Sequence, residues 1–386
     1  MRILFFISLL LILWHNVIYE LFLVIISIFD RRTEKTEIKT EELPAVSLII
    51  AAHNEEHVIE MKIRNSLSLK YPKDRIEIII ASDSSSDKTN DIIRKYSLAY
   101  DNVKLLEISS RGGKLNAYNA AIGIARGEII AFSDANTIWD SNALEELVKT
   151  LLDRRVSAAC GKLIYTNTQE SGIAYLEGIY WNIENMMKKG ESKIYSLTAL
   201  NGAIYAIRRE DYIFLNPLYS HDLCLPLLLG RSRKRTMFVE SSMAFERSGT
   251  TAKDEIKRKR RMFGRIYSFI FHNPGLFFNP LSYNPVYFFS VFSHRTIRYV
   301  LPLLHVGLFL SSIFLFGEGL FFSIIFAVQA FLLLLASMQL FLKLRTKPLM
   351  LPYYYLVFIA SMVLGFFDCI TGKIKPYWEI AATTRG

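Results

Sequence analysis

The 386-residue sequence contains only three cysteines, Cys160, Cys224 and Cys369. They lie far apart and lack the paired spacing of a metal site, so we expect buried thiols in a reducing compartment. Lysine and arginine outnumber aspartate and glutamate by 46 to 36, which gives a net charge of +10. The chain lacks an RNA-binding signature and interleaved aromatic and basic residues. The positive charge therefore indicates a membrane surface or phosphate groups, and no nucleic acid.

Apolar residues are abundant: 51% of the chain is hydrophobic, with 27 Phe and 20 Tyr, more than one soluble core requires. Residues 3–29 exceed the roughly 20 apolar residues that span a bilayer. No small-residue cleavage site follows them, which disfavours a signal peptide. Arg31 and Arg32 come next and predict that the following domain is cytoplasmic.

Three more candidate spans lie near the C-terminus, at residues 300–316, 320–342 and 349–370. The short joint at 317–319 makes the first two a hairpin, and Lys343, Arg345 and Lys347 mark its return to the cytoplasm. The last span conflicts with this charge rule, because Lys373, Lys375 and Arg385 would then lie outside. Either the rule is overridden or the final segment is interfacial or re-entrant.

Residues 271–294 are aromatic and are interrupted by Pro274, Pro280 and Pro285. This spacing forbids one straight helix and predicts an interfacial collar. The resulting division is an N-terminal membrane helix at 1–30, a cytoplasmic domain at 44–270, an interfacial segment at 271–296, membrane helices at 297–372 and a tail at 373–386.

Between the membrane segments, strand-like and helix-like runs alternate. Short β-branched runs at 46–52, 76–82, 103–108 and 128–133 predict strands. Amphipathic runs at 55–69, 87–96, 114–125 and 141–153 predict helices. The alternation indicates an α/β domain with parallel strands, and ligands bind such sheets at the carboxyl ends of the strands.

Candidate functional residues fall at those ends: the segment Ala52-His53-Asn54-Glu55 after the first strand, Asp83 after the second and Asp134 after the fourth. Asp87 is expected to cap the next helix. The segment Arg111-Gly112-Gly113-Lys114 could bring Lys114 to a phosphate, but Leu115 replaces the Ser or Thr of a P-loop, which argues against an NTPase.

The order and spacing of these segments resemble membrane-bound family 2 glycosyltransferases of the processive, cellulose- and hyaluronan-synthase-like type. The matching segments are Ala52-x-Asn54-Glu55, Asp83-x-x-Ser86-Asp87-x-Thr89, Gly113-Lys114-x-x-Ala117, Asp134-Ala135-Asn136, Asn201-Gly202-Ala203, His221-Asp222-Leu223-x-Leu225-Pro226, the basic stretch 255–264, and the tail residues Trp378, Glu379, Thr384 and Arg385.

The resemblance implies a GT-A fold, Rossmann-like with a mixed sheet, flanked by transmembrane helices. It implies a nucleoside-diphosphate sugar, most often UDP-linked, held by Ala52, Asn54, Glu55, Asp83, Lys114 and Asp134. Arg258 and Arg261 would stabilise the diphosphate, although a basic helix on anionic lipid is an alternative. Asn201, Gly202 and Ala203 would lie on the acceptor side.

Two further roles follow from the resemblance. Asp222 would be the general base, with helix capping as a compatible second role, while His221 either tunes it or fills space. Asp134 and Asn136 occupy the family's Asp-x-Asp positions and would bind Mg²⁺ or Mn²⁺. Asn136 offers a neutral amide oxygen where the family has its second Asp, so charge neutralisation is poorer.

The sequence thus predicts an inverting hexosyltransferase that forms a β-linkage to a glycan or lipid-linked acceptor in cell-surface or exopolysaccharide synthesis. Four spans are few for an export channel, so a polymerising enzyme would need oligomers or an export partner. The alternative is a catalytically silent nucleotide-sugar-binding membrane scaffold, which Asn136 favours and Asp222 disfavours.

Overall fold

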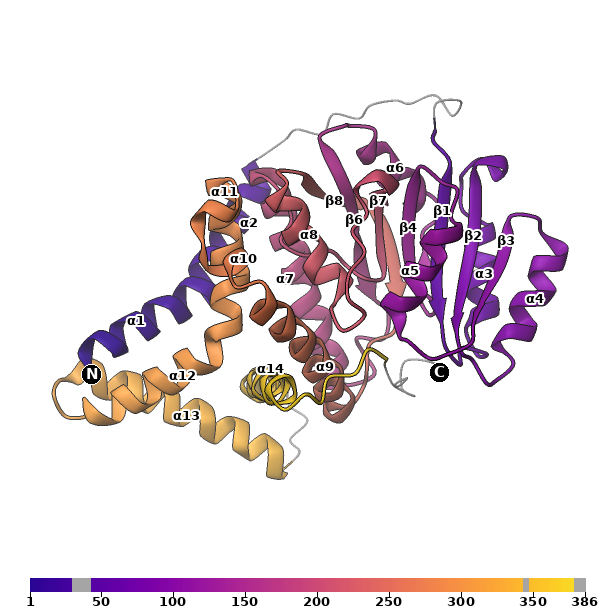
Figure 1. The fold of residues 1–386 in the computed structure, drawn as a ribbon. Helices are drawn as coiled ribbons and strands as arrows, with labels where there is room; N and C mark the ends of the chain where they lie inside the picture. Colours follow the sequence, from indigo (N-terminus) through magenta and orange to yellow (C-terminus); the bar gives the residue numbers. More distant parts are fainter. Residues whose placement is uncertain (30–42, 343–346, 378–386) are drawn as a thin grey trace.

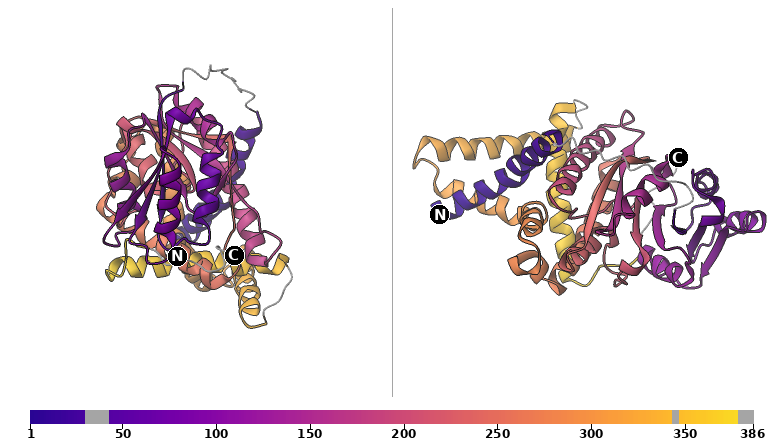
Figure 2. Two further views of the ribbon diagram at one scale, coloured as in Figure 1. Left: turned by 90° about the vertical axis from the view of Figure 1, so that its right-hand side faces the viewer. Right: turned by 90° about the horizontal axis from the view of Figure 1, so that it is seen from above.

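The computed structural model describes residues 1–29, 43–342 and 347–377 (Figure 1). An α/β domain occupies one end of the molecule, and the apolar helices extend from the other, as the two further views in Figure 2 also show. Several predictions lie outside the described residues, namely those on Arg31, Arg32, Lys343, Arg345, Trp378, Glu379, Thr384 and Arg385.

One sheet of eight strands forms the centre of the domain, in the order β3-β2-β1-β4-β7-β6-β8-β5. The strands are β1 (Val46–Ala52), β2 (Ile76–Asp83), β3 (Val103–Ile108), β4 (Ile129–Asp134), β5 (Ile138–Trp139), β6 (Val156–Tyr165), β7 (Ile204–Arg208) and β8 (Arg235–Glu246). The helices of the domain are α3 (Ile59–Leu67), α4 (Thr89–Ala99), α5 (Lys114–Ile124), α6 (Ala143–Leu151), α7 (Gly172–Ile194), α8 (His221–Arg231) and α9 (Ala252–His272).

The first half of the sheet confirms the strand predictions. β1, β2, β3 and β4 are mutually parallel where they pair, and their ends differ by no more than a residue from those expected. The second half makes the sheet mixed, because β7 runs antiparallel to both β4 and β6, whereas β6 and β8 are parallel. The expected class, a mixed-sheet α/β domain with flanking apolar helices, is confirmed.

Alternate residues of the central strands face two apolar layers. Ile49 and Ala51 of β1 pack with residues of α5, α8 and α9 on one face. Leu48 and Ile50 face the opposite layer, which contains residues of α3 and α6. Because both faces are covered, every residue of β1 is buried and the strand reads as a continuous apolar run.

The remaining helices are α1 (Arg2–Leu13), α2 (Tyr19–Phe29), α10 (Gly275–Phe278), α11 (Pro285–Ser290), α12 (Ile297–Phe314), α13 (Leu320–Leu342) and α14 (Lys347–Ile370). A π-helical segment, Trp14–Ile18, joins α1 to α2, and another, Val291–Thr296, joins α11 to α12. In the part of the chain that the structure describes, four helical stretches are long and apolar enough to cross a membrane: Arg2–Ile28, Pro285–Phe314, Leu320–Gln339 and Met350–Ile370.

The second stretch begins earlier than the sequence suggested. Its helix starts at Pro285, at the position where proline is tolerated, and continues to Phe314. The helix therefore begins before the expected span at residue 300, and residues 285–296 of the expected interfacial segment belong to it. Residues 275–282 do form the short pieces that the prolines predicted.

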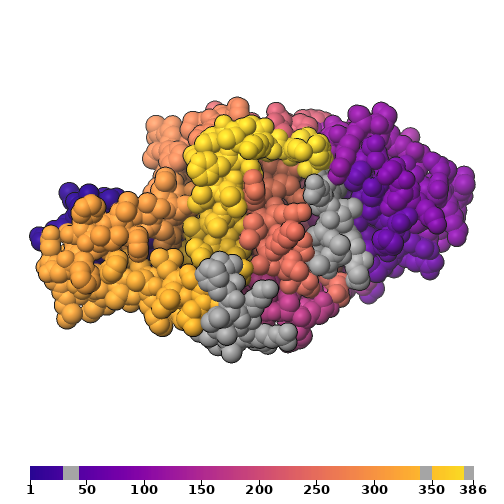
Figure 3. Space-filling model, turned by 90° about the horizontal axis from the view of Figure 1, so that it is seen from below, coloured from indigo at the N-terminus to yellow at the C-terminus, as the bar shows by residue number. Residues whose placement is uncertain are grey.

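The helix α14 differs from its neighbours in orientation. Figure 1 shows it nearly end-on, whereas α12 and α13 lie in the plane of the view, and Figure 3 shows it running across the base of the molecule beside α9. Phe358 contacts Phe263 of α9, and Phe366 contacts Tyr267. The two backbones approach closely at Gly264 and Gly365, where an added Cβ would meet main-chain atoms of the other helix. α14 therefore packs along a helix of the α/β domain.

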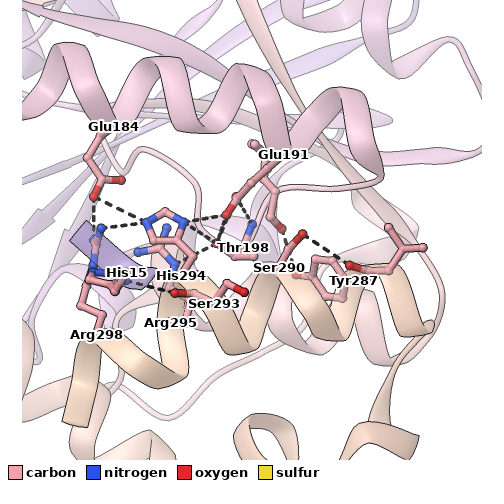
Figure 4. A network of polar contacts seen from close by, with 12 residues as sticks. His15, Glu184, Glu191, Thr198, Tyr287, Ser290, Ser293, His294, Arg295 and Arg298 are labelled. Carbon is pink, nitrogen blue, oxygen red and sulfur yellow. Dashed lines mark hydrogen bonds and ion pairs between the residues drawn. The ribbon is translucent and has the colours of Figure 1, made fainter. Parts of the chain in front are cut away.

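A buried polar network joins α7 to the apolar helices (Figure 4). The His294 ring lies 2.6 Å from Glu191 Oε1, and Arg298 donates to Glu184 Oε1 at 2.6 Å. From the N-terminal helix, His15 Nδ1 lies 3.0 Å from the Ser293 carbonyl oxygen. Glu184 and Glu191 thus each face a basic side chain at the point where the apolar helices meet the α/β domain, which limits the cost of burying them.

Candidate active site

The polar loops that follow the parallel strands meet at one edge of the sheet. Asp83, at the end of β2, is fully buried, and its two carboxylate oxygens accept from the backbone N–H groups of Gly112 and Gly113 at 2.8 and 2.7 Å. Gly113 has a φ of +89°, which favours glycine. Asp83 thus fixes the turn that presents Lys114 as the first residue of α5.

Lys114 lies between two carboxylates. Its Nζ forms an ion pair with Asp134 Oδ1 and donates to the carbonyl oxygen of Gly202 at 3.3 Å. A Cβ added at Gly202 would lie 3.2 Å from Asp222 Oδ2. Although burial opposes its charge, Asp134 raises the pKa of Lys114, with a smaller contribution from Asp222. The structure therefore brings Lys114, Asp134, Gly202 and Asp222 into one continuous cluster.

Asp222 lies in the first turn of α8, where a carboxylate complements the helix dipole. Its Oδ1 accepts from the hydroxyl of Ser220 at 2.8 Å, and its carbonyl oxygen accepts from the backbone N–H of Leu200 at 2.8 Å. The second of these hydrogen bonds links the first turn of α8 to the segment that carries Asn201, Gly202 and Ala203. The residue is half-buried, and its carboxylate faces Gly202 near the Lys114 ammonium.

His221 points into the core and away from this cluster. Its ring stacks on Tyr212, and its Nδ1 lies 2.6 Å from the Tyr205 hydroxyl. Burial, together with the charge of Lys114, lowers the pKa of His221 to about 3. The sequence left two roles open for His221, to tune Asp222 or to fill space. A neutral ring enclosed by aromatic residues corresponds to the second.

The residues at the end of β1 and just after it pack in the core or stabilise the neighbouring loops. Ala52 is fully buried in the core. Asn54 has a φ of +53°, and its Oδ1 accepts from the backbone N–H of Ser86 at 2.8 Å. The backbone N–H of Glu55 donates to Thr89 Oγ1 at 2.8 Å. Asp87 accepts from the backbone N–H of Thr89 at 3.0 Å, next to the start of α4.

Hydrogen bonds fix the expected acceptor-side segment, residues 201–203. The backbone N–H of Asn201 donates to Cys160 Sγ at 3.0 Å, and Asn201 Oδ1 accepts from the backbone N–H of Ala203 at 3.2 Å. Burial raises the pKa of the Cys160 thiol to about 11, so this group stays protonated. Cys224 is also buried, but Cys369 is partly exposed, so the expectation of three buried thiols was correct for two.

The two arginines expected at the diphosphate lie on α9. Arg258 donates to Glu177 Oε2 at 2.8 Å and to Glu255 Oε1 at 2.7 Å, so its guanidinium is paired with carboxylates of α7 and α9. Arg261 lies one turn further along and is half-buried. The structure does not join Arg258 directly to the Lys114 cluster, and this pairing competes with the expected contact to a diphosphate.

Three charged residues near the cluster were missed by sequence reasoning. Lys62 of α3 is fully buried, and its Nζ donates to the Thr137 carbonyl oxygen at 2.8 Å, directly beyond the Asp134-Ala135-Asn136 turn. Burial lowers the pKa of Lys62 to about 7, while Asp134 opposes the shift. Glu246, at the end of β8, accepts from the side-chain amide of Asn136 at 2.9 Å.

The third is Arg265 of α9. Its guanidinium donates to the carbonyl oxygens of Lys375 and Pro376 at 3.1 and 2.6 Å. Burial lowers the pKa of Arg265, and the charge of Asp222 opposes the shift. The segment after α14 also reaches the glycine turn, because Arg111 lies over the Tyr377 ring at 4.7 Å. No sequence motif marked these residues, since their roles depend on pairing between distant segments.

The oxygen donors at Asp134 and Asn136 suit a hard divalent cation. The Lys114 ammonium already occupies the Asp134 carboxylate, which shows that this position accepts positive charge. Within the described residues, no group of three or more His, Cys, Asp or Glu side chains is arranged to hold a metal. A cation here would therefore need oxygens from a ligand, as Mg²⁺ commonly takes them from phosphates.

The fold defines the class of protein: an α/β domain of GT-A type attached to apolar helices that are long enough to cross a membrane. The profile of glycosyl transferase family 2 matches residues 47–214 of the chain. It is similar to "Probable glycosyltransferase YdaM" of Bacillus subtilis, at 34% identity over 221 residues that cover 54% of this chain and 51% of that protein.

Two further similarities are informative. The beta-monoglucosyldiacylglycerol synthase of Trichormus variabilis is 37% identical over 131 residues, covering 33% of this chain and 28% of that protein. The chain spans about half the length of YdaM and less of this synthase. The solved mannosyltransferase PcManGT of Pyrobaculum calidifontis superimposes with a TM-score of 0.70 at 18% identity, covering 96% of this chain and 99% of that one, so the fold is shared.

Proposed function

We propose that this chain is an inverting glycosyltransferase that moves a sugar from a nucleoside-diphosphate sugar, with UDP as the expected nucleotide, to a glycan or lipid-linked acceptor. The observation that carries the proposal is the cluster in which Lys114 lies between Asp134 and the Gly202–Asp222 pair. A cation next to a carboxylate base is what transfer from a diphosphate requires. The match to the family 2 profile supports the same reaction.

In this mechanism Asp222 removes the proton from the acceptor hydroxyl as that oxygen attacks the sugar. Attack opposite to the departing diphosphate inverts the anomeric centre and gives a β-linkage from an α-linked donor. Lys114 lies at the N-terminus of α5, where the helix dipole adds to its charge, so both stabilise the leaving diphosphate. Asp83 contributes by holding the turn on which Lys114 depends.

A divalent cation, when bound, would neutralise charge on the diphosphate, and Asp134 and Asn136 would hold it. PcManGT was solved in complex with GDP-Man and Mn²⁺, which supports a nucleotide sugar and a divalent metal on this fold. Arg261 and Arg258 are proposed to act at the donor side of α9, although Arg258 would first have to exchange its carboxylate partners.

The acceptor is proposed to lie near the lipid surface. The name of the Trichormus relative describes a glycolipid synthase, which supports a lipid acceptor, while the processive resemblance supports a cell-surface or exopolysaccharide. Product length separates the two. A ladder of products on a defined acceptor indicates polymerisation, and a single added sugar indicates simple transfer. A polymerising enzyme would need an oligomer or an export partner to provide a channel.

The proposed location is the cell membrane, with the catalytic domain in the cytoplasm and three crossing helices rather than four. α14 has 24 residues and is therefore about 36 Å long at roughly 1.5 Å per residue, enough to carry one end across a bilayer. Yet Tyr354 near its start bonds Glu177 of α7, and Asp368 near its end pairs with Arg260 at 2.5 Å. The residues after it contact Arg265 and Arg111.

Because contacts to the catalytic domain occur along the whole of α14, we propose that this helix lies on the membrane surface. Lys373 and Lys375 are then cytoplasmic, and the conflict with the charge rule disappears. The earlier segments cross the bilayer once at the N-terminus and twice through the α12–α13 hairpin.

The proposed reaction is tested by nucleotide release from a panel of donors with a divalent metal. Asp222→Asn should lower turnover by at least about 100-fold, because a positioned general base contributes roughly 10²–10⁴-fold. Asp91→Asn on the exposed face of α4 is the control and should be silent. The silent-scaffold alternative predicts donor binding without any release by the wild-type protein, and full turnover by Asp222→Asn would exclude the mechanism.

A further inference from the structure

The short strand β5 positions Asn136 against the end of β8. β5 pairs antiparallel with β8, with Ile138 opposite Phe245 and Trp139 opposite Ala244. Continuing this register by one residue places Thr137 opposite Glu246. The contact in which Asn136 Nδ2 donates to Glu246 Oε1 at 2.9 Å is therefore set by backbone pairing.

This contact determines which end of the Asn136 amide is available. An ionised carboxylate can only accept hydrogen bonds, so the NH₂ group of Asn136 must be the end that faces Glu246. The amide oxygen, Oδ1, then points to a different side. An oxygen is the atom that a hard cation requires, whereas an amide NH₂ would repel it.

The local charge gives Glu246 a second role. The turn 134–136 carries one carboxylate, at Asp134, and the Lys114 ammonium is already paired with it; the buried Lys62 amine also lies close, on the Thr137 carbonyl. A single carboxylate that is already paired with an ammonium is a poor site for a further divalent ion. A carboxylate brought by β8 to the Asn136 amide adds the missing negative charge.

We propose that Glu246 is a positioning residue of the donor-metal site: it orients the Asn136 amide so that Oδ1 faces the cation, and it supplies the negative charge that the turn itself lacks. This inference rests on the proposed divalent site. In an Asp-x-Asp motif, the second acid of the turn supplies this negative charge. Here we assign that task to the end of β8, a strand that is distant in sequence from the turn.

The test measures Mn²⁺ binding directly, by electron paramagnetic resonance of free Mn²⁺ in the presence of UDP, on the full-length protein in detergent. Glu246→Gln should weaken Mn²⁺ binding by about 10-fold, the lower end of the effect of losing an outer-shell partner of a metal ligand. Binding of UDP in EDTA should not change. The matched control is Glu240→Gln, on the same strand but paired with Lys189 at the surface.

The decisive variant is the double substitution Asn136→Asp with Glu246→Gln. It returns the second carboxylate to the turn, so it should restore Mn²⁺ affinity to near the wild-type value. If Glu246 acted only as a hydrogen-bond acceptor, Glu246→Gln would keep an acceptor for the Asn136 amide and would bind Mn²⁺ as tightly as the wild type. Wild-type Mn²⁺ affinity in Glu246→Gln, or no recovery in a stably folded double variant, overturns the proposal.

A failure of the proposed function gives a different pattern. If the wild-type protein binds no Mn²⁺ with UDP yet releases nucleotide in EDTA, the role of Glu246 is refuted while sugar transfer stands. If it neither binds Mn²⁺ nor turns over any donor, both proposals are wrong.

Discussion

Gly202 tests how closely the acceptor-side segment lies against the proposed base. An added Cβ would lie 3.2 Å from Oδ2 and 3.4 Å from Cγ of Asp222, and 3.5 Å from Nζ of Lys114. Gly202 does not have the positive φ that makes alanine a strained replacement. Gly202→Ala should therefore leave the backbone in place and disturb the Asp222 carboxylate.

The size of the effect follows from the contact distances. Comfortable contacts of carbon begin at about 3.5 Å, so the carboxylate must move by a few tenths of an ångström. A displacement of about 1 Å in a catalytic arrangement can cost about 100-fold, so this smaller one should lower kcat by about 3- to 10-fold. The KM for the donor should change little, because Lys114 retains its position.

The assay is nucleotide release by purified protein, with the melting temperature recorded for each variant. Gly123→Ala in α5 is the matched control, because an added Cβ there meets no atom within 4 Å. It should match the wild type in turnover and be stabilised by up to about 1 kcal/mol through helix propensity. Unchanged kcat in both Gly202→Ala and the bulkier Gly202→Val would refute the placement of Asp222 as the base.

Three other outcomes are expected. Glu191→Gln removes the buried charge opposite His294 and should destabilise the protein by about 3 kcal/mol in thermal melts, since breaking a buried pair typically costs roughly 3–5 kcal/mol. The control is the exposed substitution Glu240→Gln, which should change the stability by no more than about 0.5 kcal/mol. Burial raises the pKa of Glu191, but His294 and Arg295 lower it by more, to below its ordinary 4.5. Its stabilisation is thus full above that pH and is lost as the pH falls below it, through the lowered pKa of the folded state. The wild-type melting temperature should therefore fall more steeply than that of Glu191→Gln as the pH drops below 4.5, and parallel curves would contradict this. In a Cys369→Ser background, an impermeant thiol reagent should label Glu318→Cys but not Lys375→Cys in intact cells, and labelling of both would place the end of α14 outside.

The sequence predicted the half of the sheet whose signals are local. β1 and β3 have the expected ends because an apolar, β-branched run bounded by turn residues marks a buried strand wherever its neighbours lie. The same holds for Lys114 as the start of α5, since two glycines precede it. Residues placed at strand ends were therefore identifiable before their contacts were known.

The second half of the sheet was not predicted, because its strands are positioned by pairing between segments that are distant in sequence. β8 is half-buried along much of its length and pairs with β6 through two register shifts, so no simple period marks it. Glu246 gains its position from the pairing of β8 with β6 and with β5. The partners of Arg258 were missed for the same reason: its spacing from Arg261 indicated a shared face, but Glu177 on α7 determines what that face contacts.

The helix α14 shows what hydropathy alone cannot decide. An apolar helix of this length can leave water in two ways: it can cross the lipid, or it can lie between lipid and another amphipathic helix. Both arrangements remove the same unfavourable contact with water. The second arrangement requires a neighbour with a complementary apolar face, and α9 supplies one at Phe263 and Tyr267. It also requires partners for the polar ends of α14, which Arg260 supplies for Asp368. Since those partners lie far earlier in the chain, a window of about 20 residues cannot distinguish the surface position that we propose for α14 from a membrane span, whereas the charges that follow the helix favour the surface position.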